Sequence, residues 1–202
     1  MAMLMLLGAA PLAEAQIMVS STTATTQRIY EKSGREKGWV LRPEASFGFG
    51  FIHKTGLLTH LNGTFNYQFN PYFSVGAGSG LNVFSVFRLD RNLVAVPLFV
   101  DFRAYFCDRA WSPFVDLKVG FNKSLNNVSY YSGYYWDDGV IYSLKGFLLD
   151  GTFGIQHKKF DFGVSVGMFS DYEYDPWDDW HSRRMNMLLM GYVAYNIQLS
   201  KK

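Results

Sequence analysis

From residue 38 onward, apolar and polar side chains alternate with a period of two along most of the chain. The pattern is clearest in residues 92–106, where Val100 and Phe102 belong to the apolar series and Asp101 and Arg103 to the opposite one. Successive side chains of a β-strand point to opposite faces, so this period predicts strands with two different faces.

Eight segments carry this pattern, and they are predicted to be strands. Their approximate ranges are 38–51, 58–69, 72–88, 92–106, 113–123, 145–156, 160–169 and 186–199. The joins at Asn70, at 107–113 and at 157–159 are short, whereas those at 124–144 and 170–185 are long. Short turns on the periplasmic side and long loops outside are typical of outer-membrane barrels.

The two faces of these strands differ in a way that favours a barrel in lipid over a soluble sandwich. The apolar face is bulky and uninterrupted, and the other face carries glycine, serine, amides and a few charges of both signs, as a narrow lumen requires. Backbone in lipid must be fully paired, so the sheet must close. We therefore predict an all-β fold, a membrane-spanning antiparallel up-and-down β-barrel of about eight strands. The charges expected to form a structural cluster in the lumen are Arg42, Glu44, Asp101, Arg103, Asp116, Lys118, Asp150 and Asp161.

Composition agrees with this prediction. Aromatic residues make up 18% of the 202 residues and charged residues 18%, against roughly 25% charged residues in soluble domains. No internal stretch reaches the roughly 18 apolar residues of a spanning helix. The net charge of +2 gives no reason to expect nucleic acid as a partner, and Cys107, the single cysteine, cannot form an internal disulfide.

The N-terminal residues predict export. An apolar run over 3–10 leads to the triplet Ala13-Glu14-Ala15, so residues 1–15 are interpreted as a cleaved signal peptide. Residues 16–37 are polar and then charged, and they are expected to form a flexible leader. The barrel is assigned to residues 38–202 and its location to the outer membrane of a Gram-negative bacterium.

The segment from Gly38 onward resembles the OmpA-like and OmpX-like eight-stranded outer-membrane barrels. The sequence AVPLFVDFRAYF followed by SPFVDLKVGF is similar to outer-membrane β-barrel proteins of Bacteroides-type bacteria. The resemblance covers most of the chain and carries no catalytic motif. The chain departs from such barrels at its last residues. Those barrels usually end in an aromatic residue, whereas this chain ends Leu199-Ser200-Lys201-Lys202.

The two long joins are rich in tyrosine, tryptophan and carboxylates. Rigid aromatic side chains supply contact area at low entropic cost, so these joins are candidate contact surfaces for an extracellular glycan or protein. The candidate contact residues are Tyr130, Tyr131, Tyr134, Tyr135, Trp136, Tyr172, Tyr174, Trp177 and Trp180. The alternative is that these segments extend the strands and place aromatic residues at the membrane interface. Asp175, Asp178 and Asp179 lack the spacing of a calcium loop, so no metal site and no cofactor are expected.

The expected function is a structural or surface-interaction role of a monomer with a lumen plugged by side chains. Its expected partners are outer-membrane lipid, lipopolysaccharide and, during assembly, the barrel-insertion machinery. One alternative is an enzyme that modifies lipid A. His181-Ser182 makes a poor dyad for this, because adjacent strand residues point to opposite faces. The second alternative, a soluble lipocalin-like barrel, would need the bulky face inside.

Overall fold

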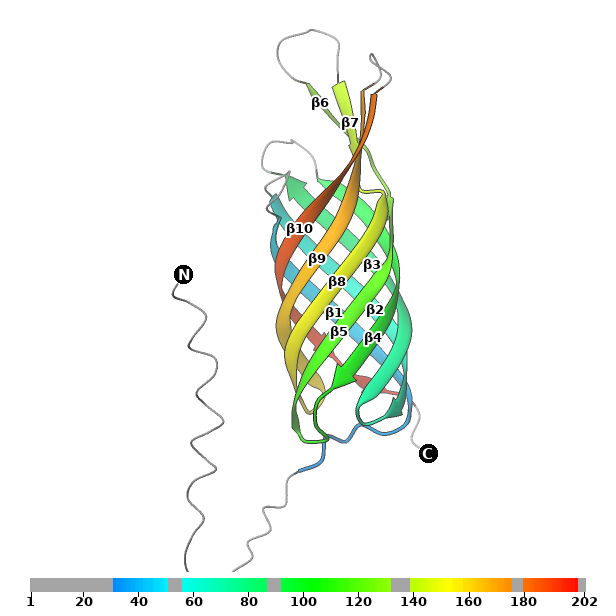
Figure 1. Cartoon of the computed structure of the whole chain (residues 1–202), viewed down its shortest axis with the longest axis vertical. Helices are drawn as coiled ribbons and strands as arrows, with labels where there is room; N and C mark the ends of the chain where they lie inside the picture. The colour runs from blue at the N-terminus through cyan, green and yellow to red at the C-terminus, as the bar shows by residue number, and fades with distance from the viewer. Residues whose placement is uncertain (1–30, 51–55, 87–91, 132–138, 176–179, 200–202) are drawn as a thin grey trace, which may run out of the picture.

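The chain forms a closed antiparallel barrel, shown in Figure 1. The computed structural model describes residues 31–50, 56–86, 92–131, 139–175 and 180–199. Its strands are β1 (Gly38–Gly50), β2 (Gly56–Asn70), β3 (Phe73–Val86), β4 (Leu93–Tyr105), β5 (Trp111–Ser124), β6 (Val128–Tyr131), β7 (Gly139–Ser143), β8 (Gly146–His157), β9 (Phe160–Asp175), β10 (Trp180–Tyr195) and β11 (Ile197–Gln198). Within these ranges no helix is long and apolar enough to cross a bilayer.

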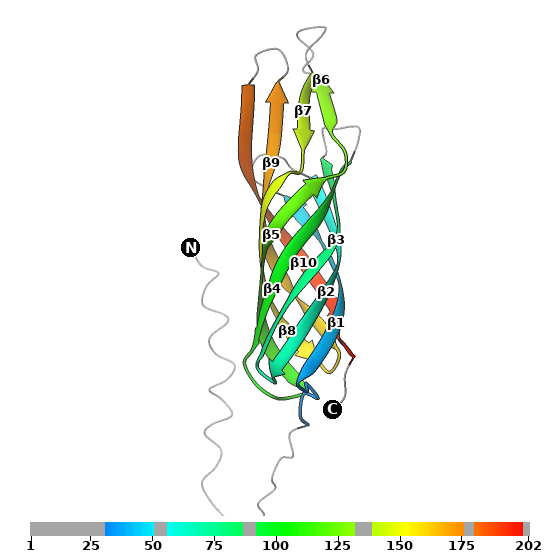
Figure 2. The ribbon, with the colours of Figure 1, turned by 90° about the vertical axis from the view of Figure 1, so that its right-hand side faces the viewer.

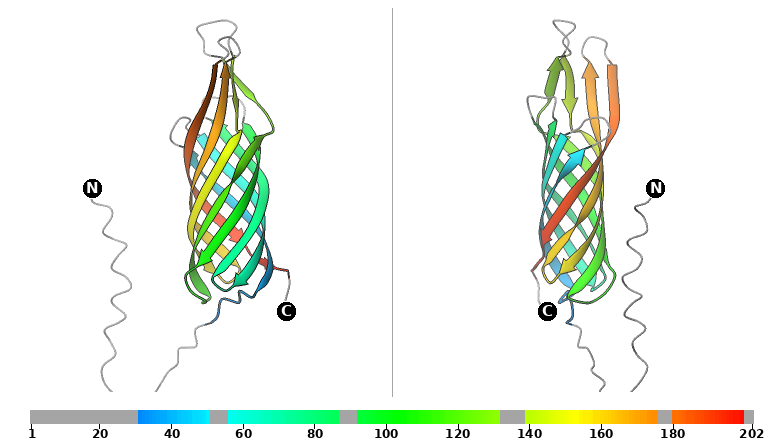
Figure 3. Two further views of the ribbon diagram at one scale, coloured as in Figure 1. Left: turned by 45° about the vertical axis from the view of Figure 1, so that its right-hand side comes forward. Right: turned by 90° about the vertical axis from the view of Figure 1, so that its left-hand side faces the viewer.

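Eight strands make the barrel wall: β1, β2, β3, β4, β5, β8, β9 and β10, each paired antiparallel with the next. The wall closes where β10 pairs with β1, in a register that runs from Glu44 opposite Ala194 to Gly50 opposite Leu188. Both views of Figure 3 show the strands inclined to the barrel axis. The predicted all-β, eight-stranded up-and-down barrel is confirmed.

Side chains alternate between the lumen and the exterior along each wall strand. In β4 every second residue, from Leu93 to Tyr105, is buried, and those between are half-buried or exposed. The strand β5 shows the same alternation in its own register, beginning with exposed Trp111 and buried Ser112. The period of two in the sequence is therefore the division between lumen and exterior.

The two ends of the barrel differ in the length of their connections. Three short turns lie at one end, here called the turn end: β2 to β3, β4 to β5, and β8 to β9. The turn from β8 to β9 is tight, and Lys158 adopts a positive φ of 55° there. The other four connections lie at the opposite end, called the loop end, and the one from β5 to β8 is long and includes β6 and β7.

A small sheet, here called the projecting sheet, rises above the loop end, as Figure 2 shows. It consists of the hairpin β6–β7, which pairs with β9 through Ile141 opposite Tyr174, and of the upper parts of β9 and β10. The long loops predicted at 124–144 and 170–185 are therefore wrong in part: strands occupy 128–131, 139–143, 170–175 and 180–185. The pairing of β9 with β10 continues beyond the closed wall, so the alternative of extended strands holds for these residues.

Candidate functional site

The barrel exterior is covered with large apolar side chains. Leu98 is 68% exposed, Phe47 54%, Phe162 53% and Val100 42%. Aromatic side chains surround the turn end and are here called the aromatic girdle: Trp39, Phe65, Tyr67, Phe69, Tyr72, Phe73, Phe106, Trp111, Phe160 and Tyr195. Within it, Trp39 stacks on Phe65 with ring centroids 4.6 Å apart. Such a surface is unfavourable in water over so large an area and suits a hydrocarbon solvent.

Charged side chains fill the lumen toward the turn end. All eight residues of the predicted lumen cluster are at least 94% buried. They come from β1 (Arg42, Glu44), β4 (Asp101, Arg103), β5 (Asp116, Lys118), β8 (Asp150) and β9 (Asp161). The polar register of five separate strands thus converges on one interior volume.

Arg42 lies at the centre of this cluster. Its Nη1 donates to Asp101 Oδ2 at 3.0 Å, and its Nε lies 3.7 Å from Asp161 Oδ2. Asn196 connects the same groups, since Arg42 Nε donates to its Oδ1 at 2.8 Å and its Nδ2 donates to Asp161 Oδ1 at 2.9 Å. The buried guanidinium of Arg42 thereby has hydrogen-bond and ion-pair partners, and a buried charge needs such partners to be stable.

Arg103 and Lys118 form ion pairs with Asp116, Asp161 and Glu44. Arg103 Nη2 donates to Asp116 Oδ2 at 2.5 Å, and its Nη1 donates to Asp161. Lys118 Nζ lies 2.7 Å from Glu44 Oε2 and 3.4 Å from Asp116 Oδ2.

Asp150 interacts electrostatically with Lys118 and also accepts hydrogen bonds from two hydroxyls. One comes from Ser165, and the other comes from Thr152 Oγ1 at 3.3 Å. The hydroxyls therefore stabilise this carboxylate together with the Lys118 ammonium.

Several uncharged members of the cluster were missed at the sequence level. Asn66 Nδ2 donates to Asp101 Oδ2 at 2.6 Å, and Arg103 Nη2 donates to Tyr192 Oη at 2.6 Å. Tyr105 also points inward and is 4% exposed, although aromatic residues at strand ends suggest the interface. The signal that places all three is register, because each shares the face of the polar residues on its strand.

Three carboxylates of the cluster lie close together. Oxygen atoms of Glu44, Asp101 and Asp116 are all within 4.8 Å of one another, a spacing that a metal ion would accept. Arg42, Arg103 and Lys118 already contact these groups. The arrangement therefore neutralises the carboxylates with side-chain cations, and no metal is needed to explain their proximity.

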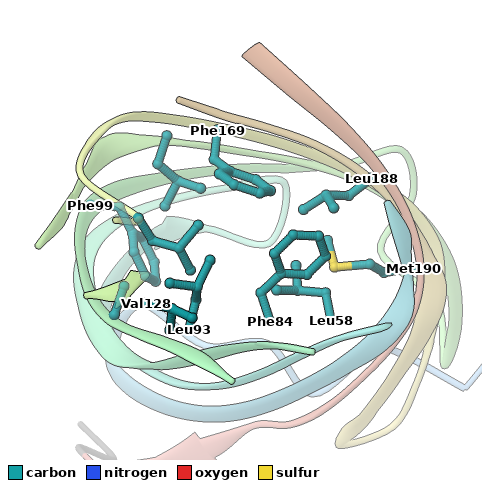
Figure 4. Packing of buried hydrophobic residues seen from close by; sticks show 11 residues of the cluster. Leu58, Phe84, Leu93, Phe99, Val128, Phe169, Leu188 and Met190 are labelled. Atoms are coloured by element: carbon teal, nitrogen blue, oxygen red, sulfur yellow. The ribbon is translucent and has the colours of Figure 1, made fainter. Parts of the chain in front are cut away.

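An apolar cluster fills the lumen toward the loop end, which corrects the expectation of an interior made of small and polar residues. Figure 4 shows Phe84, Phe99 and Phe169 pointing into the barrel together with leucine side chains and Met190. Phe84 and Phe169 meet edge to face with centroids 5.7 Å apart. Two layers therefore close the lumen: ion pairs toward the turn end and packed apolar side chains toward the loop end.

Residues 31–37, here called the strap, run across the turn end before β1 begins. Of the expected flexible leader at 16–37, this part is docked, and residues 16–30 lie outside the described residues. Arg35 Nε donates to Pro71 O at 2.8 Å, its Nη1 to Gln156 and its Nη2 to the carbonyl of Cys107. Its guanidinium also lies over the ring of Tyr105, 4.1 Å from the centroid.

Backbone conformation shapes the strap. Gly34 has a φ of 72° and Gly38 a φ of 145°, values that side-chain-bearing residues rarely adopt. The chain therefore bends on both sides of Arg35 and brings it beneath the barrel mouth. Desolvation by burial lowers the pKa of the Arg35 guanidinium, and nearby groups, including Asp108, act in the opposite direction.

The projecting sheet carries an aromatic ladder on its outward face. His181 stacks on Tyr174 with centroids 4.8 Å apart and on Tyr172 with centroids 5.7 Å apart. His181 Nδ1 lies 2.5 Å from the Tyr172 hydroxyl. Ser182 is the register partner of Glu173, whose buried side chain lies on the face of the sheet opposite the ladder. His181 and Ser182 therefore point to opposite faces.

The structure describes the predicted loop contacts unequally. Tyr130 and Tyr131 belong to β6 and Trp180 begins β10, but their side chains are not among those described. Tyr134, Tyr135, Trp136 and Trp177 lie outside the described residues. Tyr172 and Tyr174 are thus the only candidate loop contacts with described side chains.

No family model and no curated protein matches the chain. Among solved structures, the outer membrane protein OprG of Pseudomonas aeruginosa is similar, with 12% identity, a TM-score of 0.49, and coverage of 83% of this chain and 100% of that one. Neisserial surface protein A shows 10% identity and a TM-score of 0.45 over 79% and 97% of the two chains. The outer membrane protein AlkL shows 11% identity and a TM-score of 0.45 over 92% and 99%. The fold assignment rests on this chain's own strand pairing.

Proposed function

We propose that this chain is an integral outer-membrane barrel of a Gram-negative bacterium that acts at the cell surface through its projecting sheet. The observation that carries the proposal is the reversal of side-chain burial, with large apolar residues outside and ion pairs inside. In this orientation the turn end faces the periplasm and the loop end faces outward.

The height of the apolar exterior supports the proposal. On β10 the outward series runs from Tyr195 in the girdle to Met185, a distance of ten residues. At about 3.4 Å per residue and a tilt of about 40°, this span rises roughly 26 Å along the barrel axis. An outer-membrane barrel presents an apolar band about 25 Å tall. Met185 therefore marks the outer edge of the band, and the ladder of Tyr172, Tyr174 and His181 lies above it.

The filled lumen favours a structural or surface-interaction role over a pore. An eight-stranded barrel has an interior just wide enough for its own side chains. Here both a charged layer and an apolar layer occupy that interior. The proposal accordingly assigns recognition of a glycan or protein to the projecting sheet, where the rigid aromatic side chains of Tyr172 and Tyr174 are half-exposed and that of His181 is exposed.

The chain is a monomer that contacts lipopolysaccharide and depends on the barrel-insertion machinery during assembly. It is related to the Bacteroides-type barrels that its sequence resembles. We further propose that the chain has no enzymatic role, and the position of His181 and Ser182 on opposite faces of β10 supports this. Mass spectrometry of lipid A from cells with and without the protein tests this last point, and altered acylation would count against it.

Cell fractionation with heat-modifiable gel migration tests the location. The proposal predicts recovery in the outer membrane and a mobility difference between boiled and unboiled samples. Recovery in the soluble fraction contradicts it. A Tyr172→Ser/Tyr174→Ser double variant tests the surface role. It should keep heat-modifiable migration, and whole cells that carry it should lose binding to glycan or protein ligands. A matched Phe73→Ser variant on the exterior of the turn end should keep binding.

A further inference from the structure

A groove lies on the exterior of the turn end, between the strap and the aromatic girdle. It has a volume of about 740 Å³ and is lined by Arg35, Glu36, Lys37, Trp39, Tyr67 and Phe69, among others. The groove is separate from the lumen cluster, the apolar cluster and the aromatic ladder. Neither the sealed lumen nor the surface role of the projecting sheet explains it.

Both walls of the groove are held in place. On the strap side, the contacts of Arg35 with Pro71 and Gln156 fix the backbone, and the positive φ of Gly38 turns it away from the line of β1. On the barrel side, Trp39 meets Tyr67 edge to face at 5.1 Å, and Tyr67 meets Phe69 in the same way at 5.0 Å. The cavity is therefore preformed, as small-molecule sites usually are.

The lining of the groove is amphipathic. Trp39 is 44% exposed and Phe69 49% exposed, and they form an apolar wall continuous with the lipid-facing surface. Glu36 and Lys37 are exposed and adjacent at the polar rim, whereas the Arg35 guanidinium is engaged by the turns. One carboxylate and one ammonium beside an aromatic wall match a zwitterionic head group joined to acyl chains.

We propose that this groove binds one glycerophospholipid of the inner leaflet, with its phosphate at Lys37, its head-group ammonium at Glu36, and its acyl chains along Trp39 and Phe69. The inference rests on the proposed membrane orientation, which places the girdle at the head-group level of the periplasmic leaflet. The strap then has a second role besides covering the mouth, because it supplies the polar rim of the lipid site.

Native mass spectrometry of the purified, delipidated protein in detergent tests the proposal. The probes are dioleoyl-phosphatidylethanolamine, dioleoyl-phosphatidylglycerol and dioleoylglycerol, which share acyl chains and differ in head group. We expect the protein to bind one molecule of dioleoyl-phosphatidylethanolamine tightly and dioleoyl-phosphatidylglycerol more weakly. Dioleoylglycerol should bind at least about fivefold more weakly than dioleoyl-phosphatidylethanolamine. Equal binding of all three lipids overturns the site.

Variants assign the roles of the two charges. Lys37→Gln should weaken the binding of dioleoyl-phosphatidylethanolamine about fivefold, since one cation near a lipid surface contributes about that much to binding. Glu36→Gln should remove the preference for ethanolamine over glycerol. Lys159→Gln, which removes an exposed cation at the same end on the turn from β8 to β9, is the matched control and should change nothing. An effect of Lys159→Gln as large as that of Lys37→Gln contradicts a specific site.

Heat-modifiable migration and membrane fractionation of each variant separate this inference from the proposed function. A wild-type chain that is folded in the outer membrane but binds all three lipids equally overturns the groove alone. A wild-type chain recovered in the soluble fraction overturns the membrane orientation, and the lipid site fails with it.

Discussion

Arg42 Nη1 lies 3.0 Å from Asp101 Oδ2 across the lumen, and both side chains are fully buried. The two residues belong to β1 and β4, which are separated in the wall by β2 and β3. Their ion pair therefore connects strands that share no backbone hydrogen bonds. The ion pair of Lys118 with Glu44 likewise connects two strands that are not neighbours, β5 and β1.

Removing one member of this tie should destabilise the barrel strongly. Arg42→Met leaves Asp101 buried without its cationic partner, and breaking a buried ion pair costs about 3–5 kcal/mol. We expect a lower urea midpoint, measured by the loss of the fast-migrating folded form on unboiled gels. Arg183→Met, at an exposed arginine on the outward face of β10, is the control and should stay close to wild type.

The double variant Arg42→Met/Asp101→Asn should recover part of the lost stability. It removes the uncompensated charge while keeping an acceptor for the amide of Asn66, which donates to Asp101 at 2.6 Å. A double variant as unstable as Arg42→Met alone would show that the ion pair is not the origin of the effect.

The strap should depend on Arg35. Arg35→Gln removes the donors to the carbonyls of Pro71 and Cys107 and the stacking on Tyr105. Because the site is partly open to water, we expect a loss of about 1–2 kcal/mol in the docking of the strap. Limited digestion with proteinase K, followed by N-terminal sequencing, should show faster cleavage within residues 31–37. Lys159→Gln should leave the cleavage rate unchanged, and equal rates for wild type and Arg35→Gln would contradict the assignment.

The apolar cluster should contribute to stability while being dispensable for sealing the lumen. Phe84→Ala removes a side chain that is 1% exposed and in contact with Phe169, at a cost of about 3–5 kcal/mol. We expect a lower urea midpoint and no conductance in planar bilayers, because the ion-pair layer still fills the lumen. Measurable single-channel conductance of Phe84→Ala would mean that the charged layer alone does not close the barrel.

A charge on the exterior should matter according to its depth in the membrane. Val100→Arg lies near the middle of the apolar band and should cost about 2–4 kcal/mol. Leu125→Arg is the matched control, because Leu125 is 60% exposed but follows the end of β5 toward the loop end. Its cost should be about 0–1 kcal/mol. Urea titrations in lipid vesicles measure both values, and equal costs would argue against a membrane boundary between the two positions.

The closed barrel could be predicted because register alone separates lumen from exterior. The alternation around Asp101 and Arg103 assigns each residue of β4 to a face before any coordinate is known. The charges that meet in the lumen followed from the same parity. Their individual partners did not, because the pairing of Arg42 with β4 rather than with a nearer strand depends on the closure and stagger of the whole sheet.

The apolar half of the lumen was not predicted, although its residues obey the same parity. Leu58 and Phe84 share the inward register of His60 and Asn82, but a bulky apolar residue among polar ones does not disclose what it packs against. The strap was missed for a different reason. A charged segment such as residues 31–37 looks solvated, and the contacts of Arg35 arise only when two turns and the end of β8 come together around it.

The most direct test of the membrane orientation is photolabelling with a phospholipid that carries a diazirine near the middle of an acyl chain. The wild-type protein in vesicles is irradiated, and mass spectrometry locates the labelled residues. The account predicts labels at Phe47, Val100 and Phe162 and none at Phe84, Phe99 or Phe169. Labels on the second group with none on the first would contradict it.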